Sequence, residues 1–263
     1  MGKYDGILIC SDLDGTLSAH YDDGKIISDK NCEAIKTFQS EGGIFTFATG
    51  RMPEYLREII FPYVVPNAPA VTINGSMIFS FEENRYLKKV YLRDEVKKLP
   101  VEVAENYSHL VVNMDIVGED KTFNVDISGK ESVPELEKTL SLREKWCKFV
   151  FRGVDEKATL EFQEILNSGK YKNLCNFPRS WPTGQEVLDI NATKGNRVLD
   201  IKNILGNIHT VICVGDFEND ISMIKIADKG YAVENAVESV KRAADFVTVS
   251  NYDNAIAKII SEI

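Results

Sequence analysis

The sequence predicts an α/β protein whose main domain is a doubly wound parallel sheet interrupted by an inserted segment. Near both ends of the chain, apolar runs that suit buried strands alternate with amphipathic runs that suit helices. This alternation is typical of a parallel sheet with helices on both faces. Between the two ends, a hairpin pattern and a more mixed segment break the alternation.

The first part of the chain contains the first units of this sheet. Ile7 to Ser11 is an apolar run that predicts a buried strand, and Ser28 is placed to cap a helix over 29–40, which ends before two glycines. Residues 43–49 predict the second strand. Pro53 suits the first turn of the helix that follows, because its missing N–H has no partner there anyway.

The pattern changes after a third strand, expected at residues 70–73. Two apolar runs, 77–81 and 86–92, flank a polar turn and predict a hairpin. Beyond it the signals are mixed. The segment is expected to contain helices over 94–107 and 155–167 and strands over 109–114 and 146–151.

The core pattern resumes after two prolines, Pro178 and Pro182. We therefore divide the chain into a core, 1–83 with 183–263, and an inserted α/β domain, 84–182. The elements expected in the second half of the core are strands over 187–190, 211–214, 230–233 and 244–249 and helices over 194–205, 220–227 and 252–263.

Composition narrows the functional classes. The 263 residues include 31 basic and 40 acidic side chains, a formal net charge of −9, and no basic run that would follow a phosphate backbone, so nucleic acid is not an expected partner. The N-terminus has no signal-peptide pattern, and no apolar stretch approaches the roughly 18 residues that a membrane span needs. We expect a cytoplasmic protein. The five cysteines show no CxxC spacing, which indicates neither a disulfide framework nor a zinc site.

Two acidic loops follow apolar runs far apart in the chain. Asp12 and Asp14 come directly after the first strand, and Asp216 and Asp220 follow the strand at 211–214. Ligands of open parallel sheets bind beyond the carboxyl ends of the strands, so both loops are expected to face one crevice. Because such carboxylates would repel one another, a divalent cation is expected among them. Taken alone, an Asp-Gly sequence also suits a simple turn.

Two further motifs suit an anion. Thr49, Gly50 and Arg51 follow the second strand, where a hydroxyl and an accessible amide can bind a phosphate oxygen, although Thr49 can also simply cap a loop. Lys194 opens a predicted helix, a place where the helix dipole disfavours a cation. An anion in front of Lys194 would explain it, with a solvated surface lysine as the alternative.

These motifs, in this order, resemble those of the haloacid dehalogenase-like (HAD) hydrolase superfamily. Residues 73–76, 221–224 and 231–236 are similar to the Cof-type phosphatase subfamily, whose type IIB α/β cap matches the insertion. The resemblance implies a Rossmann-like core with a cap that sets substrate specificity. The motifs that carry it are Asp12-Leu13-Asp14-Gly15-Thr16, Thr49-Gly50-Arg51, Lys194 and Gly215-Asp216-Phe217-Glu218-Asn219-Asp220. Two positions depart mildly from the family pattern, Ser11 and Glu234.

The resemblance implies a phosphoric monoester hydrolase that acts through an aspartyl-phosphate. Asp12 would be the nucleophile, and Asp14 would protonate the leaving alkoxide and later deprotonate water. Mg²⁺ would be held by Asp12, the backbone carbonyl of Asp14 and Asp216, with Asp220 orienting Lys194 or a metal-bound water. The groups expected to hold the phosphate oxygens are the catalytic residues Thr49 and Lys194, the amide of Gly50, and Asn219. Leu13 and Arg51 are also expected to bind substrate.

The substrate implied is a small phosphate monoester, with sugar phosphates as one class. A phosphosugar mutase of the same superfamily is an alternative, and a non-catalytic regulator that binds a phosphorylated ligand is another. Neither the particular ester nor the oligomeric state follows from the sequence. Weaker candidates for substrate recognition, for which packing is the alternative, are Asn176, Phe177, Arg179 and Trp181.

Overall fold

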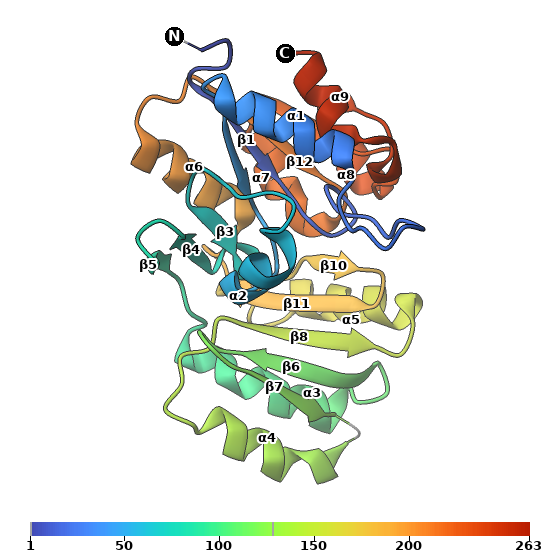
Figure 1. Ribbon diagram of the computed structural model, residues 1–263. Helices are drawn as coiled ribbons and strands as arrows, with labels where there is room; N and C mark the ends of the chain where they lie inside the picture. The colour runs from blue at the N-terminus through green and yellow to red at the C-terminus, as the bar shows by residue number, and fades with distance from the viewer. Residues whose placement is uncertain (1, 128) are drawn as a thin grey trace. The chain divides into compact units, whose positions relative to one another are not determined.

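The computed structural model describes residues 2–127 and 129–263, and the chain forms two compact units (Figure 1). The first unit, the core, extends to Lys89 and resumes over Thr193–Ile263, and the second, the cap, is Val90–Ala192. The sequence placed these crossings earlier, at 83/84 and 182/183. The difference arises from two strands next to the crossings. The strand at residues 85–89 was expected in the cap but pairs within the core, and the strand at residues 184–189 was expected in the core but pairs within the cap.

The core sheet is parallel throughout, as predicted. Its strand order is β14-β13-β12-β1-β2, with β1 at Ile7–Ser11 pairing in register with both β12 and β2. The bounds of the other strands are Ile44–Phe47 for β2, Thr210–Gly215 for β12, Lys229–Ala232 for β13 and Phe246–Val247 for β14.

Helices cover both faces of this sheet, which confirms the predicted fold class. On one face, Ile9 of β1 packs in a cluster with Ile35 and Phe38 of α1 and with residues of α9. On the other, Leu8 packs with residues of α6 and α7. The alternation of neighbouring β1 side chains between the two clusters is the period of a strand buried on both sides. The helices are α1 (Asp29–Ser40), α2 (Pro53–Tyr55, continuing as a wider turn to Ile60), α6 (Lys194–Leu205), α7 (Ile221–Ile226), α8 (Glu238–Ala243) and α9 (Ala255–Ser261).

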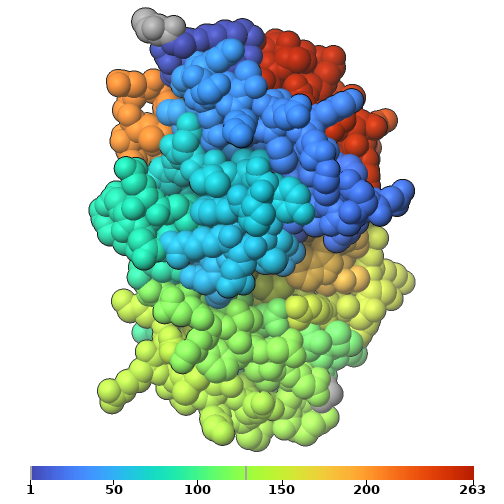
Figure 2. Space-filling model, viewed as in Figure 1, coloured from blue at the N-terminus to red at the C-terminus, as the bar shows by residue number. Residues whose placement is uncertain are grey.

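Helix α1 begins and ends where its sequence signals place it. The hydroxyl of Ser28 accepts a hydrogen bond from the backbone N–H of Asn31 at 3.2 Å, and Ile35 and Phe38 are buried. The ring of Phe38 lies 4.8 Å from that of Tyr4. Helix α9 packs beside α1, and Figure 2 shows the blue N-terminal and red C-terminal segments next to one another on the surface of the core.

The strand at Ala70–Thr72, β3, does not join the parallel sheet as a full strand. It pairs antiparallel with β4 (Met77–Ser80), which pairs with β5 (Arg85–Lys89), and this hairpin keeps β5 in the core. One isolated parallel bridge, between Ala48 and Val71, links β3 to the end of β2.

The cap is an antiparallel sheet packed on helices. Its strand order is β10-β11-β8-β6-β7, with β9 also paired to β11. One cluster of buried side chains unites the sheet with α3, α4 and α5. The elements are α3 (Leu99–Asn106), β6 (Val111–Val117), β7 (Thr122–Asp126), α4 (Val133–Leu140), β8 (Lys148–Gly153), α5 (Glu156–Ser168), β9 (Cys175–Asn176), β10 (Arg179–Trp181) and β11 (Gly184–Asp189).

Two sequence assignments are corrected here. The run 187–190 was predicted as a core strand, but residues 187–189 belong to β11 of the cap, where Val187 pairs with Phe149 of β8. An apolar run reveals that a strand is buried but not which sheet it joins. The helix expected over 94–107 is divided, because Pro100 is tolerated only in a first turn, so a short 3₁₀ segment precedes α3.

Within the described residues, no helix combines the length and apolarity that a membrane span requires.

The packing of Phe38 generates a stability prediction. Phe38→Ala should lower the free energy of unfolding by about 3–5 kcal/mol, because a fully buried ring is removed and the cavity closes only in part. Urea denaturation of the full chain measures the change. Ile204→Ala is the control, since Ile204 lies on α6 with 51% of its surface exposed and should change stability by no more than about 0.5 kcal/mol. Equal midpoints for the two variants would contradict the packing described.

Candidate active site

The two acidic loops lie at the same edge of the core sheet because their strands are neighbours. Ser11, the last residue of β1, is level with Val214 of β12. The backbone N–H of Asp12 donates to the carbonyl of Val214 at 2.9 Å, which continues the ladder one residue beyond the strand. Asp12 and Asp216 therefore leave adjacent parallel strands side by side, as the sequence predicted.

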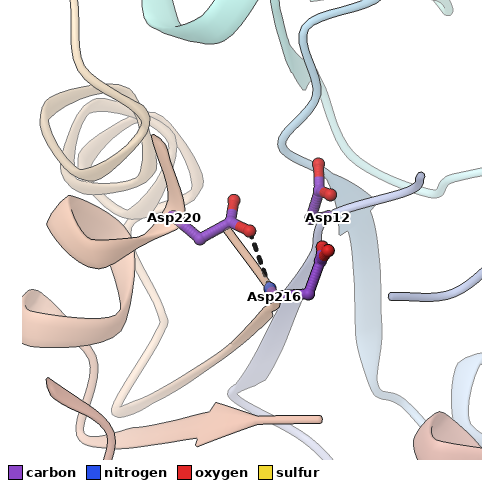
Figure 3. A group of neighbouring side chains, drawn as sticks. All are labelled: Asp12, Asp216 and Asp220. Atoms are coloured by element: carbon purple, nitrogen blue, oxygen red, sulfur yellow. Dashed lines mark hydrogen bonds between the residues drawn. The ribbon is translucent and has the colours of Figure 1, made fainter. Parts of the chain in front are cut away.

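Three carboxylates converge at this edge (Figure 3). One oxygen from each of Asp12, Asp216 and Asp220 lies within 4.8 Å of the others. Asp12 and Asp216 rise from the ends of the strands, and Asp220 approaches from the turn that leads into α7. Its Oδ2 accepts the backbone N–H groups of Asp216 at 2.9 Å and of Phe217 at 3.2 Å, which fixes the loop around it.

Lys194 is buried between two of these carboxylates. Its Nζ donates to Oδ1 of Asp12 and to Oδ1 of Asp220, both at 2.6 Å. Only 1% of the residue is exposed, which excludes the surface lysine considered from the sequence. The carboxylates are the anions that a lysine at this helix start requires, and Thr193 caps α6 through the N–H of Asn196.

The electrostatics leave the cluster short of positive charge. Burial, reinforced by Asp220, raises the pKa of Asp12 well above its usual range even though Lys194 opposes the shift. Burial and Asp220 also raise the pKa of Asp216 to about 7. Burial alone would lower the pKa of Lys194, but the carboxylates of Asp12 and Asp220 outweigh it and raise the pKa. The three carboxylates carry more negative charge than one lysine can balance, and the metal-binding atoms that they offer are all oxygens. Both properties fit a hard divalent cation such as Mg²⁺.

The first acidic loop contributes two residues whose roles were not assigned from the sequence. The hydroxyl of Thr16 donates to Oδ1 of Asp216 at 2.8 Å. Gly15 has φ of +81°, and a Cβ there would lie 2.6 Å from Oδ2 of Asp216. Only glycine fits both the conformation and the space, so Gly15 permits the approach of Asp216 that Thr16 then holds.

Asp14 lies apart from the cluster and binds Arg51. Its side chain is 50% exposed, and its two oxygens accept hydrogen bonds from Nε and Nη2 of Arg51, each at 2.8 Å. The predicted role of Asp14 as a metal ligand involves only its backbone carbonyl and stays a prediction.

The Thr49 loop is hydrogen-bonded to Asn74, a residue of the 73–76 stretch to which the sequence analysis assigned no role. The hydroxyl of Thr49 accepts the N–H of Arg51 at 3.2 Å, and its carbonyl accepts the N–H of Asn74 at 2.9 Å. Nδ2 of Asn219 donates to Oδ1 of Asn74 at 3.2 Å, and a Cβ on Gly50 would lie 3.0 Å from the same oxygen. Asn74 thus joins the two predicted phosphate-binding stretches.

The turn that carries Asn74 is strained. Ile73 and Asn74 have φ of 51° and 53°, in the left-handed region that a β-branched residue such as Ile73 avoids. Asparagine adopts this conformation more readily and is enriched in it, which is the signal that could have identified Asn74 as a special position. Strained turns of this kind cluster at functional sites.

The remaining residues singled out from the sequence lie in the core and in the cap. Leu13 is buried in the core, so that any contact with substrate would come from its backbone. The hydroxyl of Ser11, one of the two departures from the family pattern, donates to the carbonyl of Asp12 at 2.6 Å and is thereby satisfied. In the cap, the amide of Asn176 donates to the carbonyl of Asp189 at 2.6 Å, and Phe177 is buried, which favours packing for both.

Comparisons with known proteins show the family to which the chain belongs and support its fold. The sequence model of the haloacid dehalogenase-like hydrolase family matches residues 9–260. A 5-amino-6-(5-phospho-D-ribitylamino)uracil phosphatase, YcsE of Bacillus subtilis (strain 168), is 30% identical over 96% of this chain and 94% of its own. Among solved structures, SMU.1108c of Streptococcus mutans UA159 has a TM-score of 0.80 at 22% identity, covering 97% of both chains. The HAD subclass IIB sugar phosphatase BT4131 has a TM-score of 0.77 at 24% identity, covering 97% of this chain and 98% of its own.

The chain therefore belongs to the haloacid dehalogenase-like hydrolases. The family predicted from the four motifs is confirmed, and so is the prediction of an enzyme of the hydrolase class. The two structural matches share the whole fold with this chain, which supports the α/β core with an α/β cap.

The raised pKa of Asp216 predicts how stability varies with pH when no divalent metal is present. The folded state holds a proton on Asp216 up to about pH 7, compared with an ordinary pKa of 3.8. This contribution to stability is complete below about pH 4 and is lost as the pH rises through 7. Urea unfolding with a chelator at pH 5 and pH 8 should show a larger loss for the natural protein than for Asp216→Asn. Equal losses would show that Asp216 ionises normally.

Proposed function

We propose that this protein is a Mg²⁺-dependent phosphatase that hydrolyses small phosphate monoesters through a phosphorylated Asp12. The observation that carries the proposal is the buried cluster at the end of β1 and β12, in which Lys194 binds both Asp12 and Asp220 while Asp216 lies beside them. Phosphatase is also the activity in the name of the relative at 30% identity.

Mg²⁺ would be held by the carboxylates of Asp12 and Asp216 and by the backbone carbonyl of Asp14. When bound, the ion supplies positive charge that offsets repulsion between the nucleophile and the phosphate. Asp220 is occupied by Lys194 and by two backbone N–H groups, so we assign it to holding the lysine and the loop rather than to the metal.

In the first step, Oδ2 of Asp12 attacks phosphorus while Lys194 holds Oδ1. The bond from phosphorus to the leaving oxygen breaks, and Asp14 gives its proton to that oxygen, so the product alcohol leaves neutral. In the second step, Asp14 takes a proton from a water molecule, whose oxygen attacks phosphorus. The bond from phosphorus to Asp12 then breaks and inorganic phosphate is released.

The phosphate oxygens would be held by groups of the neighbouring loops. Thr49, the amide of Gly50, Lys194 and Asn219 are the groups proposed from the sequence for this task, and in phosphoryl transfer such positioning supplies most of the catalysis. The contact of Asn74 with Asn219, and its closeness to Gly50, place these two groups within one connected structure, which supports that assignment.

The names of relatives suggest which esters to test first. Three Bacillus subtilis relatives, at 30%, 24% and 24% identity, are named phosphatases of 5-amino-6-(5-phospho-D-ribitylamino)uracil, and a structural match is named a sugar phosphatase. These compounds carry a phosphate ester on a polyhydroxylated carbon chain. We propose this class as the substrate of the present chain, with specificity set by the cap.

The alternatives make different products. A phosphosugar mutase would return the phosphoryl group to a second hydroxyl and release little inorganic phosphate. A regulator would bind a phosphorylated ligand tightly with no turnover, but binding alone does not require an acid at Asp14. Release of inorganic phosphate from a panel of sugar and polyol phosphates separates the three.

Asp12→Asn tests the nucleophile. The amide cannot form the aspartyl-phosphate, so phosphate release should fall by about 10³-fold or more, and the far-ultraviolet circular dichroism should be unchanged. Asp22→Asn, which removes a carboxylate from an exposed turn of the same unit, should keep full activity. An active Asp12→Asn variant would exclude the covalent mechanism.

The metal site predicts a stability change that is independent of turnover. Mg²⁺ at about a hundred times its Kd should stabilise the natural protein by about 2.7 kcal/mol, since the ion binds the folded state only. Asp216→Asn should lose most of this stabilisation, and Asp22→Asn should keep it. Thermal unfolding with and without Mg²⁺ measures the effect, and equal stabilisation of all three proteins would place the ion elsewhere.

A further inference from the structure

Arg51 and Asp14 form a pair of hydrogen bonds to which no function has yet been assigned. Nε and Nη2 of the guanidinium point at the two carboxylate oxygens in the fork geometry, both at 2.8 Å. Such paired, charge-assisted bonds fix the orientation of a carboxylate more strictly than a single contact. An exposed ion pair adds little stability, so orientation is the main effect of this one.

Arg51 is also held by contacts other than those with Asp14. The guanidinium of Arg51 lies over the ring of Tyr55, 4.4 Å from its centre, a contact that orients a planar cation. The backbone of Arg51 is bound at both ends, its N–H to the hydroxyl of Thr49 at 3.2 Å and its carbonyl to the N–H of Ile73 at 3.1 Å. The arginine is thus preorganised by the loop that carries it.

We propose that Arg51 is a positioning residue for Asp14, through which it assists proton transfer to the leaving group, and that it is not a ligand of the transferred phosphate. The inference rests on the proposed phosphatase function. It differs from the expectation based on the sequence, in which Arg51 binds substrate directly. The reason is geometric, since Nε and Nη2, which form one of the two forks of the guanidinium, are both bound to Asp14, and this carboxylate fixes where the guanidinium lies.

The fork is compatible with a proton on Asp14. A carboxyl group that carries a proton on one oxygen still offers the other as an acceptor, so Arg51 keeps one hydrogen bond while the protonated oxygen turns to the leaving group. As the bond from phosphorus to the leaving oxygen breaks, that proton moves to the leaving oxygen and Asp14 becomes a carboxylate. Both fork bonds then form again. Asp14 is half exposed, so a substrate can reach it.

A pair of substrates with different leaving groups tests the proposal. An alkyl phosphate needs a proton on its departing oxygen, whereas p-nitrophenyl phosphate releases a stable phenolate without one. The transferred phosphoryl group is the same in both. Loss of a phosphate ligand therefore lowers kcat/KM for both substrates alike, and loss of a group acting through Asp14 lowers it for the alkyl ester selectively. The ratio kcat/KM covers only the steps up to departure of the leaving group, which isolates this proton transfer from hydrolysis of the phosphorylated Asp12.

Arg51→Ala should lower kcat/KM for the alkyl phosphate by about 10- to 100-fold and that for p-nitrophenyl phosphate by less than about threefold, because general acid catalysis contributes about 10²–10⁴-fold in all. Inhibition by inorganic phosphate should stay unchanged. Arg51→Lys, which keeps the charge without the fork, should show the same selectivity in weaker form. Arg57→Ala is the matched control, since Arg57 is also an exposed arginine stacked on aromatic rings but binds Asn84. Its kinetics should equal those of the natural protein.

The double variant makes the test stricter. If Arg51 acts only through Asp14, then Asp14→Asn with Arg51→Ala should be no slower on the alkyl phosphate than Asp14→Asn alone. Equal losses on both substrates, weaker inhibition by phosphate, or additive losses in the double variant would each overturn the proposal. A natural protein that releases no phosphate from either ester would instead overturn the proposed function, so the two failures are distinguishable.

Discussion

The placement of one buried cation between two buried acids is the constraint on which the rest of the site depends. Burying a lysine is costly unless its charge is paired, and Lys194 meets Asp12 and Asp220 at 2.6 Å each. Those contacts require the start of α6, the end of β1 and the turn before α7 to reach one point. The parallel order of the core sheet makes this possible, because it sends β1 and β12 to the same edge.

The loops around this point are shaped as much by missing side chains as by those present. At Gly15 a Cβ would meet Asp216, and at Gly215 it would lie 2.4 Å from the Cβ of Asp220. Each glycine lets a carboxylate come nearer than any other residue would allow. The acidic motif is therefore a steric arrangement as well as a chemical one, and this explains why its glycines stand beside its acids.

Much of this arrangement could be predicted from the sequence, because its signals are local. The apolar run of β1, the cap at Ser28 and the acids after each strand indicate strands, helices and a common edge. The partners of individual side chains are set by tertiary contacts between distant segments, which no local pattern encodes. The pairing of Arg51 with Asp14, the bond from Thr16 to Asp216 and the membership of residues 187–189 in the cap sheet depend on such distant contacts.

Asn74 combines a strained backbone, which lowers stability, with a side-chain contact that organises the site. Glycine would adopt the left-handed turn at this position with less strain and would keep the backbone bond to Thr49, but it has no side-chain oxygen to accept the hydrogen bond from Asn219. The chain thus has a more strained backbone at this position and, with it, a side-chain link between the Thr49 loop and the loop of Asn219. Selection for thermal stability alone would favour glycine at position 74, whereas selection for turnover would favour asparagine. The two requirements therefore oppose one another at this one position.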